Sequence, residues 1–503
     1  MKILSAAQIR ELDAYTIQQE PVSSVQLMER AATACTAYLL NNFQEASFTV
    51  LAGTGNNGGD GLAIARLLDI SGMPVDVILA GSIHSGSADF KTNLERLKLR
   101  PQIAVNLFKS GEEINLKPKN VIVDCLFGTG LNKPVAGEFK QLIQSINASA
   151  NTVISIDVPS GLASDLGPIN PEAEIVKADL TLTFHVPKIT FMFEPFAQYV
   201  GKLEILDIGL NREFHDSFIS DSHFLLKNEL AALVKQRERF SYKNSFGHGL
   251  LLAGSKGKIG AAILSGSAFL KAGAGLLTSH IPACGYVAMQ TALPEAMCSV
   301  DENENYISKV DTTGYDAIVA GPGLGINEST VAVLTHALRT TDKPVLLDAD
   351  ALTILSENLD LWQYLKNRAC VLTPHPGEFD RLFHCGKDPV TQYQELRKQA
   401  IEKSCVIVLK GAYTRIACSD GNVYFNSSGN AGMATAGSGD VLSGIIGGLL
   451  CSGYSAKDAA LLGVYLHGAA GDIYAQKEAQ ESLTASELIN YLGQAWGKLH
   501  EAI

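Results

Sequence analysis

Short apolar runs alternate with helical patterns along almost the whole chain. The runs are continuous rather than alternating with polar residues, which is typical of strands buried on both faces of a sheet. Such strands, separated by helices, predict βαβ units around a parallel sheet. In the first half the strands are expected at Ser47–Ala52, Val75–Leu79, Val121–Leu126, Val153–Asp157, Leu180–Phe184 and Leu203–Ile208.

A second series of the same kind follows the polar, irregular stretch 211–222, which we interpret as a linker. A helix is expected near Glu229–Gln236, and two long helices, Val441–Leu450 and Ala459–Gln476, are expected to close the domain. The two halves show no convincing internal repeat, so the pattern predicts two different α/β domains. The strands of the second half are expected at Leu250–Ala253, Leu276–Ser279, Ala317–Ala320, Val345–Leu347, Cys370–Leu372, Val406–Leu409, Thr414–Ala417 and Val423–Phe425.

Composition narrows the class of protein. The 503 residues are 46% hydrophobic and 18% charged, which is typical of a well-buried enzyme. A formal net charge of −12 without a Lys/Arg block argues against nucleic-acid binding. The nine cysteines include no Cys-x-x-Cys pair, which favours reduced, packed thiols over zinc ligands. Without a signal sequence or long apolar span, we expect a cytoplasmic homo-oligomer that acts on small molecules and binds no membrane.

The loop after the first strand, 53–58, matches the G-x-G-x-x-G pattern of dinucleotide-binding proteins. Binding of NAD also needs an acidic residue at the end of the next strand, where it holds the ribose hydroxyls. That strand ends instead in Ile78-Leu79-Ala80-Gly81. A nicotinamide-dependent oxidoreductase therefore loses support.

Polar side chains stand at the ends of several first-half strands. Asp124 and Asp157 follow apolar runs, and Asn57 lies in the loop after the first strand. Carboxyl ends of parallel strands converge on one crevice, so Asn57, Asp124 and Ser160 are candidates to coordinate a monovalent cation through oxygen. The alternative for each Asp taken alone is that it caps a helix or turn.

The first half resembles the NAD(P)H-hydrate epimerase family over roughly residues 1–215. The matching segments are 27–31, 56–61, Asp124, 128–134 and 157–161. The resemblance implies a Rossmann-like three-layer domain, a K⁺ ion held by Asn57, Asp124 and Ser160, and interconversion of the R and S hydrates. Asp157 is our choice for the acid/base group. The hydrate-binding residues that the resemblance implies are Asn56, Asn57, Gly58, Gly59, Asp60, Gly128, Thr129, Gly130, Leu131, Asn132, Lys133, Pro134 and Asp157.

A glycine-rich loop, Gly429–Gly439, delivers a single acid, Asp440, to the start of an apolar helix. Glycines let backbone N–H groups crowd together, and a helix N-terminus carries partial positive charge, so the segment suits a phosphate. The alternative is an ordinary helix cap. No G-x-x-x-x-G-K-[S/T] pattern occurs, which excludes a P-loop.

Three further loops of the second half have residues suited to phosphate or ligand contact. Segment 410–414 follows a strand with a lysine, a glycine and two hydroxyls, and the glycines of 321–325 permit close backbone approach. His375 is fixed between two prolines at a strand end, which favours a functional role over a structural one.

These segments resemble the NAD(P)H-hydrate dehydratase family, a branch of the ribokinase-like fold. The match runs from about Asn228 to the C-terminus and also includes 254–262, 272–275, 348–352 and 373–378. We set the domains at 1–215 and 222–503. The resemblance implies ADP as co-substrate, with Mg²⁺. It places hydrate binding on Ala261, Gly325, His375 and Asp440, and adenylate binding on Lys410, Gly411, Ala412, Tyr413, Thr414 and Gly439.

The chemistry of removing the ring hydroxyl suggests that Asp440 acts as a general base. Hydroxide leaves poorly, so the ring hydroxyl must first be phosphorylated, with Asp440 taking its proton and the N–H groups of 436–439 stabilising the transferred phosphoryl. Glu378 is a candidate to position Mg²⁺. Two rivals stay open. One is a vitamin kinase of the hydroxymethylpyrimidine or thiazole type, and the other is a nucleotide-sensing scaffold without catalysis.

Overall fold

The computed structural model describes residues 1–503 except 113, 115, 131–133, 168–172, 367 and 503. The chain forms two compact units, one of residues 2–220 and one of residues 221–503 that also takes up Met1. Both are α/β domains built on parallel strands, as the sequence pattern predicted. Within the described residues, no helix is both long and apolar enough to span a membrane.

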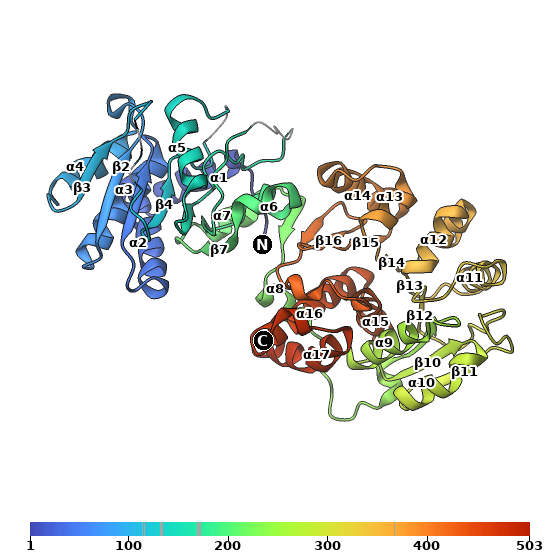
Figure 1. Ribbon diagram of the computed structural model, residues 1–503. Helices are drawn as coiled ribbons and strands as arrows, with labels where there is room; N and C mark the ends of the chain where they lie inside the picture. The colour runs from blue at the N-terminus through green and yellow to red at the C-terminus, as the bar shows by residue number, and fades with distance from the viewer. Residues whose placement is uncertain (113, 115, 131–133, 168–172, 367, 503) are drawn as a thin grey trace. The chain divides into compact units, whose positions relative to one another are not determined.

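The N-terminal domain is built on a seven-stranded sheet (Figure 1). All its pairs are parallel. Its order, β3-β2-β1-β4-β5-β6-β7, reverses direction between β1 and β4, and ligands of open α/β sheets bind at such a switch point. The strands are β1 (Phe48–Ala52), β2 (Val75–Leu79), β3 (Ala104–Leu107), β4 (Val121–Cys125), β5 (Val153–Ile156), β6 (Leu180–Phe184) and β7 (Lys202–Leu206).

Helices cover both faces of this sheet, since its strands are apolar on both sides. Side chains of α2, α3 and α4 pack on one face, and α5 packs on the other. The helices of the domain are α1 (Ala6–Gln19), α2 (Ser24–Asn42), α3 (Asn56–Ile70), α4 (Ala88–Lys98), α5 (Gly137–Ala148), α6 (Glu194–Val200) and α7 (Arg212–Ser217).

The C-terminal domain has a ten-stranded sheet of order β11-β10-β9-β12-β13-β14-β15-β16-β17-β8. The pairs β15–β16 and β16–β17 are antiparallel and the others are parallel, and the order reverses between β9 and β12. The strands are β8 (Ser222–Phe224), β9 (His248–Leu252), β10 (Leu276–Ile281), β11 (Met297–Val300), β12 (Ala317–Ala320), β13 (Val345–Leu347), β14 (Cys370–Leu372), β15 (Val406–Leu409), β16 (Arg415–Ala417) and β17 (Val423–Phe425).

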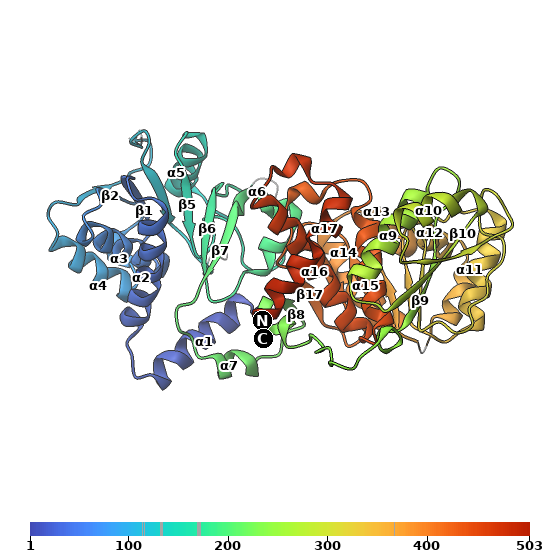
Figure 2. The same ribbon diagram turned by 90° about the horizontal axis from the view of Figure 1, so that it is seen from below.

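The main core of this domain joins the sheet to α9, α15, α16 and α17. Figure 2 shows α15 beside α9. Glycines permit this close approach, because a Cβ at Gly444 of α15 would lie only 2.1 Å from the carbonyl oxygen of Ser265 on α9. The helices are α8 (Lys227–Ala231), α9 (Ile259–Lys271), α10 (Tyr286–Ala292), α11 (Glu328–Thr340), α12 (Ala349–Glu357), α13 (Pro376–Phe383), α14 (Pro389–Lys403), α15 (Ser438–Cys451), α16 (Ala456–Ala475) and α17 (Ala485–His500).

The stretch 211–222 differs from the irregular linker expected. Asn211 caps α7, which buries His215, and Ser222 begins β8, which pairs in parallel with β17. Polar composition concealed this short helix, since only one of its six residues is buried. The helix expected near Glu229–Gln236 is also shorter, because α8 ends at Ala231.

Candidate functional sites

The first crevice lies where β1, β4 and β5 end. Asn57 stands in the first turn of α3, and Asp157 follows β5 directly. Gly128 lies against both, because a Cβ built on it would be 3.3 Å from Asn57 Cβ and 3.5 Å from Asp157 Oδ2. The structure thus brings together three of the predicted hydrate-binding positions. Leu131, Asn132 and Lys133 lie outside the described residues.

The three candidate cation ligands are joined by hydrogen bonds. Asn57 Nδ2 donates to the Phe127 carbonyl at 2.9 Å, and the Phe127 N–H donates to Ser160 Oγ at 2.9 Å. Ser160 Oγ in turn donates to Asp124 Oδ1 at 2.6 Å. Asn57 Oδ1 is buried without a hydrogen-bond partner in the described part of the chain. An unpaired buried oxygen of this kind is costly, so it fits a site completed by a cation.

Asp124 caps no helix, but its Oδ1 accepts a hydrogen bond from the Leu126 N–H at 3.2 Å, so it does cap a turn. It is fully buried and accepts hydrogen bonds from the Ser160 N–H at 2.9 Å and from Ser155 Oγ at 2.8 Å. Burial raises the pKa of Asp124, while the hydrogen bonds from Ser160 and Ser155 oppose that rise. The Asp124 carboxylate is thus held in one orientation beside Ser160, the neighbouring candidate cation ligand.

Two charged residues of this crevice, Lys188 and Asp13, were not predicted from the sequence. Lys188, after β6, is 1% exposed and pairs with Asp157 at 2.8 Å. Burial raises the pKa of Asp13, on α1, to about 6, and the charge of Asp157 adds to the rise while Lys188 opposes it. Burial, followed by Asp157 and Asp13, also raises the pKa of Asp60 well above its ordinary value. Neither Lys188 nor Asp13 belongs to a glycine-rich motif, so only tertiary structure reveals them.

The second crevice lies at the carboxyl ends of β13 and β15 and at the start of α15. Asp348 follows β13, and its Oδ1 lies 2.9 Å from Nζ of Lys410, which follows β15. Ser443 of α15 donates to the other oxygen, Oδ2, at 2.5 Å. Lys410 also reaches the helix start, since a Cβ at Gly439 would lie 3.4 Å from its Nζ.

Asp440 lies in the first turn of α15 but does not cap it. The N-cap is Gly437, with φ of +84°, and no side chain caps this helix. Burial raises the pKa of Asp440 to about 6, and the charge of Asp348 adds to the rise while Lys410 opposes it. A carboxylate with such a pKa suits proton transfer near neutral pH.

The other predicted hydrate positions of this domain border the same strand ends. Ala261 packs against the 321–325 loop, because a Cβ at Gly323 would lie 3.1 Å from Ala261 Cβ. The Gly325 N–H donates to Asp350 Oδ2 at 2.8 Å, and Lys258 Nζ lies 3.4 Å from the same oxygen. After burial and the charge of Asp348, the charge of Asp350 also raises the pKa of Asp440, whereas Lys410 opposes the rise.

His375 is a structural cap as well as a candidate ligand. Its Nδ1 accepts hydrogen bonds from the N–H groups of Gly377 and Glu378, so it caps α13. Glu378 Oε2 accepts from the His375 N–H at 2.9 Å and completes a capping box. This cap holds the Glu378 carboxylate, while the His375 side chain stays 54% exposed and open to a ligand.

A cavity of about 500 Å³ adjoins Asp440's helix. It is lined by five predicted adenylate positions, Lys410, Gly411, Ala412, Thr414 and Gly439. The sixth, Tyr413, is not among the lining residues; burial raises the pKa of its hydroxyl. His467 of α16 also lines the cavity and was missed by sequence analysis. Burial lowers its pKa to about 4, so this ring is neutral at pH 7.

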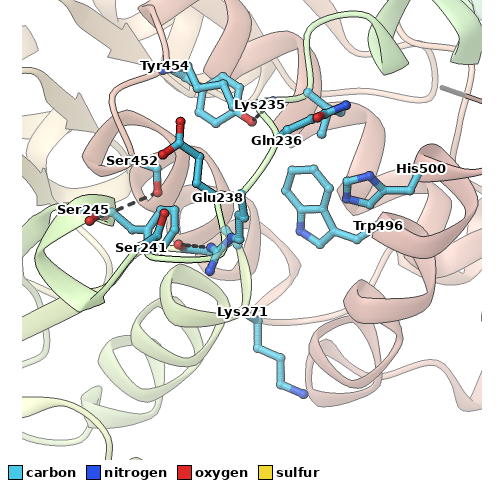
Figure 3. A pocket seen from close by; sticks show the side chains of 15 residues that line it. Lys235, Gln236, Glu238, Ser241, Ser245, Lys271, Ser452, Tyr454, Trp496 and His500 are labelled. Carbon is cyan, nitrogen blue, oxygen red and sulfur yellow. Dashed lines mark hydrogen bonds between the residues drawn. The ribbon is translucent and has the colours of Figure 1, made fainter.

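A second cavity, of about 580 Å³, opens elsewhere in the domain, among Lys235, Arg237, Tyr454, Trp496 and His500 (Figure 3). Two of its cationic side chains already donate hydrogen bonds to backbone carbonyls. Lys235 Nζ donates to the Gly453 carbonyl at 2.6 Å, and Arg237 donates to the Gly273 carbonyl at 2.5 Å. Both carbonyls lie just beyond helix C-termini, where cations are stabilising, so these side chains serve the fold.

Comparison with known proteins agrees with this geometry. Residues 24–190 match the YjeF-related protein N-terminus family, and residues 249–494 match the NAD(P)H-hydrate dehydratase family. The bifunctional NAD(P)H-hydrate repair enzyme Nnr of Thermofilum pendens is 35% identical, over 100% of this chain and 97% of that protein.

Solved structures match the C-terminal domain. A ribokinase-like superfamily protein from Enterococcus faecalis is 29% identical, with a TM-score of 0.50, over 56% of this chain and 98% of its own. The ADP/ATP-dependent NAD(P)H-hydrate dehydratase of Bacillus subtilis, co-crystallised with ATP/Mg²⁺, is 33% identical over 55% of this chain and 98% of its own, with a TM-score of 0.48.

The two crevices and these matches define a YjeF-related domain fused to a ribokinase-like domain. The chain belongs to the family of bifunctional NAD(P)H-hydrate repair enzymes. The family resemblance drawn from the sequence and the predicted α/β fold of both domains are therefore confirmed. The individual binding residues stay predictions.

Proposed function

We propose that this chain repairs hydrated NADH and NADPH at two separate sites. The N-terminal domain interconverts the R and S hydrates, and the C-terminal domain converts the S hydrate to NADH or NADPH at the expense of ADP. The observation that supports the proposal is that each domain holds one carboxylate beside the loops to which the resemblance assigns ligands: Asp157 after β5, and Asp440 in the first turn of α15.

At the first site, Asp157 acts as acid and base. The hydroxyl at C6 of the ring accepts a proton and leaves as water, and the ring nitrogen supplies the electron pair that stabilises the cation formed. Water then adds to either face of C6 and returns a proton to the carboxylate. Gly128 puts no side chain in front of Asp157 Oδ2, and in this proposal the ring lies on that side of the carboxylate.

We further propose that K⁺ binds beside this site. Asn57 Oδ1, Asp124 and Ser160 would hold it, and the unpaired buried oxygen of Asn57 supports this choice. When bound, K⁺ supplies a positive charge that orders the strand-end loops and attracts the anionic nucleotide. Apart from binding K⁺, Ser160 also fixes the Asp124 carboxylate by a hydrogen bond, as Ser155 does.

At the second site, the C6 hydroxyl attacks the terminal phosphorus of ADP while Asp440 takes its proton. The phosphoryl group passes from ADP to the hydroxyl, giving AMP and a phosphate ester. The C6–O bond then breaks, a proton leaves C5, and phosphate and the dihydronicotinamide ring are released. Lys410 and the N–H groups at the start of α15 stabilise the charge on the transferred group.

Mg²⁺ is expected to arrive with the nucleotide. No group of three His, Cys, Asp or Glu side chains suited to a metal exists among the described residues. Mg²⁺ bound through nucleotide phosphates and water needs only one or two carboxylates, so the residues present fit this arrangement. When bound, it neutralises phosphate charge. Glu378 is the weaker candidate ligand, since His375 already engages its carboxylate.

A direct assay tests the proposal. Mixed R and S hydrates of NADH are incubated with the protein, K⁺, Mg²⁺ and either ADP or ATP, and absorbance of the reduced ring is followed. We expect recovery beyond the amount of S hydrate initially present. If neither nucleotide gives recovery, the proposed function is wrong. Phosphorylation of a hydroxymethylpyrimidine or thiazole alcohol instead would favour the vitamin-kinase rival.

A further inference from the structure

Lys188 is an ammonium group buried at the end of β6. Its side chain is 1% exposed, and a charge so placed must be paired to be tolerated. Nζ lies 2.8 Å from Asp157 Oδ1 and donates to the carbonyls of Val186 at 3.3 Å and Phe184 at 3.4 Å. An ammonium has three donors, so the three acceptors fix it completely. Lys188 therefore cannot itself reach a substrate.

The paired carboxylate is held in an unusual way. Asp157 has φ of +65°, in the left-handed region that few residues other than glycine adopt. Its N–H donates to the Leu182 carbonyl of β6 at 2.7 Å, which anchors the backbone against the neighbouring strand. Backbone held in this region at a strand end is one way in which active sites fix the direction of a side chain.

The two oxygens of Asp157 have different surroundings. Oδ1 is taken by Lys188, whereas Oδ2 points toward Gly128, where a Cβ would come within 3.5 Å of it. Gly128 begins the loop to which the family resemblance assigns the hydrate. One oxygen is thus anchored, and the other faces the loop to which the resemblance assigns the hydrate.

Several other ionisable groups surround this pair. Asp13 of α1 and Asp60 of α3 interact electrostatically with Asp157, and so does Cys35 of α2. His185, the residue directly after β6, interacts electrostatically with Lys188. Three carboxylates in one crevice repel each other, and a carboxylate free to rotate would turn toward solvent. A fixed cation offsets that repulsion.

We propose that Lys188 is a positioning residue for epimerisation, whose ammonium fixes Asp157 so that Oδ2 faces the C6 hydroxyl of the hydrated ring. The inference rests on the proposed function of the N-terminal site. Proton transfer in both directions at one carbon needs an oxygen within hydrogen-bond reach of both the leaving and the entering hydroxyl. A small misplacement of that oxygen costs about 100-fold in rate.

The test uses the full-length protein without ADP, so that only epimerisation proceeds. One purified epimer of hydrated NADH is supplied with K⁺, and appearance of the other is measured by chromatography. Wild-type protein must epimerise first; failure here overturns the proposed function and not this inference alone. We expect Lys188→Met and Lys188→Gln to lower kcat about 100-fold. Their KM should stay within about threefold of wild type, since binding contacts remain.

Two controls separate positioning from a structural role. Lys188→Arg keeps the charge and should retain more kcat than either neutral variant. In an Asp157→Asn background, Lys188→Met should cost nothing further, because Lys188 acts only through Asp157. Lys188→Gln keeps hydrogen-bond donors and guards against failure of the Met variant to fold. A kcat near wild type in the neutral variants, or losses that multiply in the double variant, would overturn the inference.

Discussion

Lys410 Nζ lies 2.9 Å from Asp348 Oδ1, at the point where β13 and β15 end and α15 begins. Burial alone would lower the pKa of Lys410, but the charges of Asp348 and Glu378 raise it above its ordinary value. The same Asp348 accepts a hydrogen bond from Ser443 of α15. This carboxylate therefore ties Lys410, which we propose faces the phosphate, to the helix that carries Asp440.

Replacing Asp348 should break the link between Lys410 and α15, the helix that carries Asp440. Asp348→Asn removes the partner of Lys410, so we expect dehydration kcat to fall about 100-fold through misplacement of the phosphoryl group. Ser443→Ala is the matched control, because it removes a hydrogen bond to Asp348 but keeps the ion pair with Lys410. It should cost less than about tenfold. Steady-state kinetics with purified S hydrate and ADP measures both. Equal losses in the two variants would contradict the assigned role of the ion pair.

The raised pKa of Asp440 predicts how dehydration depends on pH. A general base must be deprotonated, and burial raises the pKa of Asp440 to about 6, so kcat should rise as pH increases through about 6. In Asp348→Asn the nearby negative charge is lost, which lowers the pKa of Asp440 and moves the midpoint to lower pH. The pH profile of kcat measures this. An unmoved or upward-shifted midpoint would argue against the assignment.

Potassium dependence should reside in the N-terminal domain alone. Asn57→Leu removes the buried oxygen that lacks a partner among the described residues, so epimerisation should lose its response to K⁺. Dehydration of the S hydrate by the same protein should be unchanged, which provides an internal control. Epimer exchange is measured across K⁺ concentrations, with choline as the replacement cation. A variant that still responds to K⁺ like wild type would refute the ligand set.

Close packing of α15 on α9 should be visible in stability. A Cβ at Gly444 would lie 2.1 Å from the Ser265 carbonyl, so we expect Gly444→Ala to destabilise the domain by about 3 kcal/mol. Gly493 of α17 has no atom within 4 Å of such a Cβ, and Gly493→Ala should stabilise by about 0.5–1 kcal/mol. Both tryptophans, Trp362 and Trp496, belong to the C-terminal domain, so their fluorescence in urea reports its unfolding separately. Equal effects of both substitutions would contradict the packing argument.

Much of this architecture follows from the sequence, because apolar runs buried on both faces leave a strong pattern. The central strands β12, β13 and β14 begin and end at the predicted residues. The edge strands β3 and β11 were not predicted, since their side chains are largely exposed and their runs are less apolar. The closing helix α17 was also missed, as its amphipathic pattern follows two more apolar helices.

The residues of the candidate sites also fall into two groups, those with a local sequence signal and those that only the fold brings together. Glycine loops and acids at strand ends or helix starts are local signals, so Asn57, Asp157 and Asp440 could be predicted as site residues from sequence. Lys188 and Asp13 come from segments without a glycine motif and reach the crevice only through the fold. No spacing rule connects residue 13 to residue 157, and this part of the site therefore needed the structure.

The central claim is that one chain carries two independent repair sites. Asp157→Asn and Asp440→Asn proteins are each incubated with mixed hydrates, K⁺, Mg²⁺ and ADP, alone and together, and NADH absorbance is followed to completion. We predict that Asp157→Asn recovers only the S fraction, that Asp440→Asn recovers none, and that the mixture recovers nearly all. Failure of the mixture to exceed Asp157→Asn alone, or full recovery by Asp440→Asn alone, would contradict the account.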